Sequence, residues 1–198
     1  MRVEWVRLAS LTVGLLASSA AGADVSGPVS FVPWKVVAPG DSPAKSPLTL
    51  YWIPASRDDF KHSELLFSRP LTSYASQCVA MQVIRVDDAV MIEKLGAAGA
   101  LPIAVLLDGD GRQLGKVDND RGALKVAEVE RLVREQLRAR EAVLDARLED
   151  ARRKASAGDR DSAVATYKSI CDLRCAFPRK AKEAERELKK LDALAVSR

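Results

Sequence analysis

The sulfur and imidazole chemistry of this chain rests on Cys78, Cys171, Cys175 and the single histidine His62. Cys171 and Cys175 lie four residues apart in a segment with helical periodicity, so they share one face of a helix. A disulfide between them requires the helix to distort near Phe177-Pro178, because a relaxed bridge brings the Cβ atoms to about 3.5–4.5 Å. A structural bridge, two packed thiols and a redox or metal site remain as alternatives for this pair. Cys78 is expected to pack as a small buried hydrophobe.

A second group with chemical potential is Ser56-Arg57-Asp58-Asp59, which is followed by His62. A serine nucleophile needs a base within reach, but His62 lies about 240° around the helix from Ser56. The same residues predict a capping box, in which Ser56 caps a helix and Asp59 bonds back to the backbone N–H of Ser56. Too few ligands cluster for a metal site, so we predict no catalytic residue, no metal and no cofactor.

Residues 100–111 form an apolar run that opens near Pro102 and closes with Asp108-Gly109. Such a run predicts a buried strand that ends in a tight hairpin, with residues 112–117 returning as its antiparallel partner. Positive φ is expected at Asp108-Gly109. Residues 48–53 predict a first central strand with Tyr51 and Trp52 on opposite faces. These strands alternate with helical segments, which indicates an α/β domain.

Together these pieces resemble a thioredoxin-like protein. The resemblance rests first on Leu101-Pro102, which opens a strand that ends in Asp-Gly, and on Trp52 in the central strand. It rests further on the stretches Leu-Phe-Ser-Arg-Pro at 66–70 and Val-Ile-Arg-Val-Asp at 83–87. The resemblance covers about residues 48–137. It implies a three-layer domain with a mixed central sheet flanked by helices. It also implies that Pro102 is cis and faces the turn of the redox motif, and that the Leu101 backbone pairs with extended substrates.

The chain departs from that family at the redox turn, where Ser56 and Asp59 occupy the two cysteine positions. A serine hydroxyl forms no mixed disulfide and a carboxylate resolves none, so dithiol exchange at residues 56–59 is excluded. We therefore expect a redox-inactive scaffold that binds a protein or peptide segment beside Leu101 and Pro102 by strand addition. The alternative is a thiol–disulfide redox protein that uses Cys171 and Cys175. Binding is favoured over enzymatic activity, which the sequence does not exclude.

The first residues carry the features of an export signal. Two arginines precede an apolar run, and Ala21-Gly22-Ala23 fits a cleavage site, so we predict a signal peptide at 1–23 and a periplasmic or secreted product without stable membrane insertion. A proline-rich lead-in at 24–47 is expected to contribute one edge strand. The thioredoxin-like domain then covers 48–140, and a helical extension covers 141–198.

The extension resembles a tetratricopeptide unit with its capping helix. Apolar residues recur at helical spacing around a Gly158-Asp159 turn and again after Phe177-Pro178, which predicts an α-helical hairpin beyond a long helix. One repeat buries little surface alone, so the extension is expected to pack back on the domain, or else to offer a groove or a dimer surface. The net charge of +4 is spread among interleaved acidic and basic residues, which argues against a nucleic-acid partner.

Overall fold

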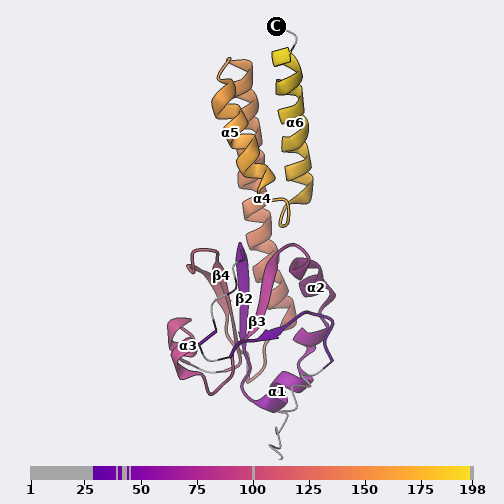
Figure 1. The fold of residues 1–198 in the computed structure, drawn as a ribbon. Helices are drawn as coiled ribbons and strands as arrows, with labels where there is room; N and C mark the ends of the chain where they lie inside the picture. Colours follow the sequence, from indigo (N-terminus) through magenta and orange to yellow (C-terminus); the bar gives the residue numbers. More distant parts are fainter. Residues whose placement is uncertain (1–28, 39, 42–43, 45, 100, 197–198) are drawn as a thin grey trace, which may run out of the picture.

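The computed structural model describes residues 29–38, 40–41, 44, 46–99 and 101–196. The expected signal peptide and its cleavage site lie outside these residues. The described chain is an α/β protein in which a five-stranded mixed sheet carries helices on both faces and is followed by a helical region (Figure 1). Within the described residues, no helix is both long and apolar enough to cross a bilayer.

The sheet has the order β1-β3-β2-β4-β5. Its strands are β1 Lys35–Val36, β2 Leu48–Ile53, β3 Val79–Val83, β4 Ile103–Asp108 and β5 Gln113–Val117. Strand β2 runs parallel to β3 and antiparallel to β4, and β1 forms the short edge strand beside β3. The central strand at 48–53 and the edge strand in the lead-in are therefore confirmed.

The β4–β5 hairpin is built around the side chain of Asp108. This carboxylate accepts hydrogen bonds from the backbone N–H groups of Asp110 and Arg112, at 3.0 and 2.9 Å. These bonds, together with the Arg112 guanidinium, hold the pKa of Asp108 below its ordinary value. The antiparallel return is confirmed, but positive φ occurs at Gly111 and not at Asp108-Gly109, because four residues rather than two connect the strands.

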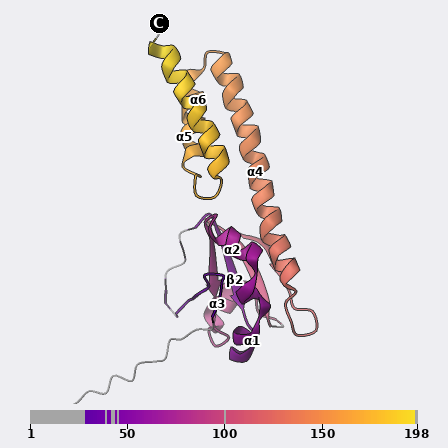
Figure 2. The same cartoon turned by 90° about the vertical axis from the view of Figure 1, so that its right-hand side faces the viewer.

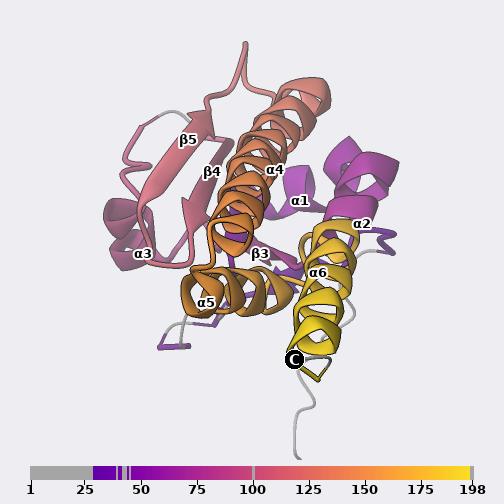
Figure 3. The ribbon, with the colours of Figure 1, turned by 90° about the horizontal axis from the view of Figure 1, so that it is seen from above.

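Two faces of the sheet bury two separate cores. One face packs Leu50, Trp52 and Leu106 against α1 Arg57–His62, the 3₁₀ helix η1 Glu64–Phe67, α2 Arg69–Ala75 and the first half of α4 Val126–Ser156. The other face packs Tyr51 and Ile53 against α3 Ala89–Lys94. Because successive strand residues point to opposite faces, Tyr51 and Trp52 separate as predicted. Figure 3 shows α4 crossing the sheet.

The helical region continues from α4 without a break at the domain boundary. Helix α4 has 31 residues: Val129, Val133 and Leu137 pack on the sheet, whereas Leu144 and Leu148 belong to a third core. That core is completed by α5 Arg160–Cys171 and α6 Pro178–Val196, which lie beside the distal half of α4 (Figure 2).

The extension thus packs mainly on the distal half of α4. The expectation that it packs back on the body of the domain is wrong. Its link to the domain runs through the α5–α6 connection, where Phe177 packs against both the sheet core and the extension core. The apolar stripe of the extension faces α4 because α4 is long enough to carry a second set of buried positions.

Candidate functional site

The turn after β2 contains Ser56 and Asp59, and both side chains are occupied by a helix cap. Ser56 Oγ accepts from the Asp59 N–H at 3.0 Å, and Asp59 Oδ2 accepts from the Ala55 N–H at 2.8 Å. These two bonds satisfy donors that a helix N-terminus otherwise leaves unpaired. The predicted cap by Ser56 is confirmed, but Asp59 bonds back to the N–H of Ala55 and not, as predicted, to the N–H of Ser56. Arg57 and Asp58 are exposed in the first turn of α1.

His62 does not activate Ser56. Its Nδ1 lies 3.0 Å from the carbonyl oxygen of Asp58 and 3.5 Å from the Asp58 carboxylate, on an exposed face of α1. Since Ser56 Oγ already accepts a backbone N–H and has no imidazole beside it, the turn has no arrangement for nucleophilic catalysis.

The Leu101–Pro102 segment lies at the same end of the sheet as this turn. Ile53 at the end of β2 pairs with Ile103 at the start of β4, so the residues after β2 and before β4 leave the sheet together. The Leu101–Pro102 peptide bond is cis, as the resemblance implies, and Pro102 is buried while Leu101 is half-buried. Among the described residues, none forms a backbone hydrogen bond with Leu101.

Removing the cap should cost stability rather than function. We expect Ser56→Ala to lower the free energy of unfolding by about 1 kcal/mol, because the Asp59 N–H loses its acceptor. Urea unfolding of the variant against wild type measures this loss. Arg57→Ala is the matched control, because it removes an exposed side chain that forms no hydrogen bond with any described residue. A Ser56→Ala variant as stable as wild type would contradict the structural role of Ser56.

The cysteines pair differently from the prediction. Cys78 and Cys175, 97 residues apart in sequence, form the disulfide with a Cα–Cα distance of 5.7 Å, and Cys171 is free. The expected Cys171–Cys175 bridge is wrong, because α5 ends at Cys171 and the following turn carries Cys175 toward the start of β3. Cys78 is accordingly not a free packed thiol. Burial raises the pKa of the Cys171 thiol and so disfavours its thiolate. This weakens the alternative hypothesis of a redox protein that uses Cys171 and Cys175.

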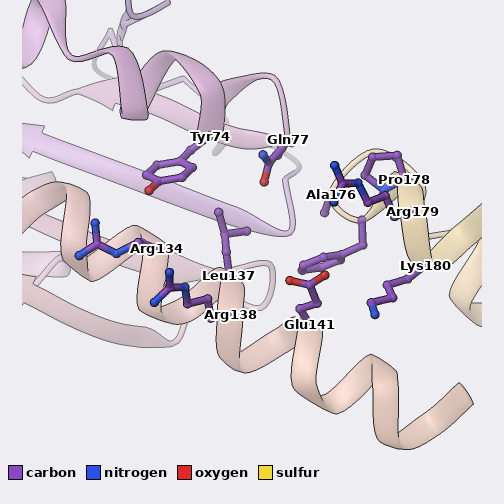
Figure 4. A pocket seen from close by; sticks show the side chains of 11 residues that line it. Tyr74, Gln77, Arg134, Leu137, Arg138, Glu141, Ala176, Pro178, Arg179 and Lys180 are labelled. Atoms are coloured by element: carbon purple, nitrogen blue, oxygen red, sulfur yellow. The ribbon is translucent and has the colours of Figure 1, made fainter. Parts of the chain in front are cut away.

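A groove between the domain and the extension was not foreseen. It has a volume of about 400 Å³, and its basic side chains come from α4 and from the start of α6 (Figure 4). We call it the basic groove. Its lining residues are Tyr74, Gln77, Arg134, Leu137, Arg138, Glu141, Ala176, Phe177, Pro178, Arg179 and Lys180. The i, i+4 spacing of Arg134 and Arg138 was visible in the sequence, but the residues that face them were not.

No protein-family model and no curated protein matches this chain at a significant level.

Among the described residues, no group of three or more histidine, cysteine or acidic side chains gathers in a way that could hold a metal ion.

Proposed function

We propose that this chain is a thioredoxin-like binding module that has lost dithiol chemistry and holds an extended protein segment at the Leu101–Pro102 end of its sheet. The observation that carries the proposal lies at Leu101, a half-buried residue whose backbone makes no backbone hydrogen bond to a described residue. Backbone N–H and C=O groups in such a position need partners, and an added strand supplies both a donor and an acceptor.

Three features support the thioredoxin-like part of the proposal. The mixed sheet lies between helices on both faces, the proline that opens β4 is cis, and Ser56 and Asp59 sit at the start of the helix that follows β2. The register of β2 and β4 brings this turn and Pro102 to one end of the sheet. These are the relationships that the resemblance implies between the redox turn and its facing proline.

Dithiol exchange is excluded at this turn because Ser56 and Asp59 occupy the two cysteine positions of the resemblance. Ser56 and Asp59 hold the N-terminus of α1, so this position contributes to folding and leaves the neighbouring backbone for recognition. The chain without the predicted signal peptide at residues 1–23, called the mature chain below, should therefore not accelerate the reduction of insulin by dithiothreitol.

Selection of peptides from a displayed random library on the mature chain provides the probe. A selected peptide should slow amide hydrogen exchange at Leu101, because its backbone would accept the Leu101 N–H. In isothermal titration calorimetry, Leu101→Asp should weaken its binding about tenfold or more, since a carboxylate replaces apolar surface beside the added strand. Val143→Asp is the matched control, because Val143 is 59 % exposed on α4.

Two results would overturn this proposal. One is a selected peptide that binds Leu101→Asp and Val143→Asp equally well. The other is slowed exchange elsewhere on the chain with Leu101 unchanged. Leu101→Ala, measured beside Leu101→Asp, separates lost binding from lost folding, because it keeps the site neutral.

A further inference from the structure

The basic groove lies at the end of the sheet opposite to Leu101. Leu48 at the start of β2 pairs with Val79, which follows Cys78, whereas Ile53 at the other end pairs with Ile103. Six strand residues separate these ends, which corresponds to about 17 Å. The groove is therefore a surface independent of the proposed strand-addition site.

The groove carries cations that lack acidic partners. Among the described residues, no carboxylate forms an ion pair with Arg134, Arg138 or Arg179. Lys180 differs, because it is paired with Asp145. Glu141 is the acidic residue in the lining. Three unpaired guanidinium groups around one space favour an anionic ligand, since each can hold a carboxylate by two parallel hydrogen bonds.

The floor of the groove is apolar and aromatic. Leu137 is buried, Phe177 and Tyr74 are half-buried, and all three line the groove together with the arginines. Figure 4 shows Tyr74 and Leu137 among these side chains. The ligand should therefore present apolar groups between its charges, as a polypeptide does and as a simple inorganic ion does not.

A second hollow on the extension continues the positive surface. It also has a volume of about 400 Å³, and it shares Arg179 with the basic groove. Lys182, Arg186 and Lys190 follow Arg179 at spacings of three and four, so they lie along one face of α6. From Arg179 to Lys190 this face runs about 16 Å, the length of about five residues of extended chain.

We propose that the basic groove and this face of α6 together bind an extended acidic segment of a partner protein. The carboxylates of Glu141, Glu183 and Glu187 interrupt the row of cations, and within the second hollow Glu183 pairs with Arg152 and Glu187 pairs with Lys190. A polypeptide accommodates them by placing neutral or basic residues opposite, whereas a nucleic acid places a phosphate at every step and is repelled. The mixed signs along this surface favour the acidic peptide.

The probe is a fluorescein-labelled peptide of about ten residues in which glutamate alternates with valine, so that apolar groups lie between its charges, and it is long enough to span the groove and the α6 face. Binding to the mature chain is measured by fluorescence anisotropy at about 0.15 M salt, where exposed long-range attraction is screened. We expect saturable binding that Arg134→Gln, Arg138→Gln and Arg179→Gln together weaken about tenfold or more. The matched control combines Arg69→Gln, Lys94→Gln and Arg131→Gln, which remove the same charge from other exposed positions.

The proposal is supported if the affinity for the peptide falls less than about twofold in the control variant and does not change in Leu101→Asp. The binding site is then local and separate from the strand-addition site. The proposal is overturned if the peptide binds equally well to wild type and to the variant in which the three groove arginines are replaced. It is also overturned if the control variant loses as much affinity as that variant. A ten-nucleotide oligothymidylate that binds at least as tightly as the peptide also overturns it, and assigns the surface to nucleic acid instead.

Discussion

Replacing Cys78 and Cys175 together with serine is expected to lower the free energy of unfolding by about 3–5 kcal/mol. The disulfide closes a loop between residues 97 apart in sequence, and a long loop gives the unfolded chain much entropy that the bridge removes. It also fastens the α5–α6 connection to the start of β3, so its loss removes a covalent link between the extension and the domain that adds to α4 and to the packing of Phe177.

Urea unfolding followed by far-ultraviolet circular dichroism measures this effect, with dithiothreitol added to wild type as the chemical equivalent of the double variant. Cys171→Ser is the matched control, since Cys171 is free and half-buried. Peptide mapping without reduction should recover Cys78 linked to Cys175. Recovery of Cys171 linked to Cys175, or a double variant as stable as wild type, would contradict this assignment.

Trp52→Ala is the second substitution with a large expected effect, a loss of about 3–5 kcal/mol of unfolding free energy. Trp52 is 1 % exposed at the centre of the sheet, and its ring centroid lies 5.4 Å from those of both Trp34 and Phe60. The substitution opens a cavity between β2, α1 and the lead-in, which the surrounding helices can fill only in part.

Trp52→Phe separates ring packing from the indole N–H. Trp52 Nε1 is buried and has no hydrogen-bond partner among the described residues, so phenylalanine removes an unsatisfied donor while it keeps most of the aromatic contact. We expect Trp52→Phe to retain at least about 2 kcal/mol more stability than Trp52→Ala in thermal or urea unfolding followed by circular dichroism. Equal losses in the two variants would be inconsistent with a packing role for the ring.

The local elements could be predicted because their signals lie close together in sequence. The capping box needs residues three apart, the β4–β5 hairpin follows from an apolar run and an Asp-Gly pair, and Gly158-Asp159 ends α4. Asp88, immediately before α3, likewise caps that helix by accepting the N–H of Met91. Helix ends and strand runs depend on hydrogen bonds and side-chain alternation over a few residues, and the sequence contains that information directly.

The cysteine pairing and the basic groove could not be predicted in the same way. Cys171 and Cys175 are close in sequence, yet the bridge joins Cys175 to Cys78 because the end of α5 meets the start of β3 in space. Arg179 and Arg134 likewise meet across one groove although α5 lies between them in sequence. Residues brought together by the crossing of elements leave no local spacing to detect.

The sequence by itself determined the central strands, the cap at Ser56, the absence of a dithiol at residues 56–59 and the helical hairpin that follows a long helix. The tertiary structure alone decided which cysteines pair, where the helical extension packs and which groove arginines have no acidic partner among the described residues. The physical reason is the separation along the chain over which each kind of interaction acts. Backbone hydrogen bonds and periodic burial act between near neighbours in the chain, whereas a disulfide across 97 residues and a groove between helices depend on how those elements pack.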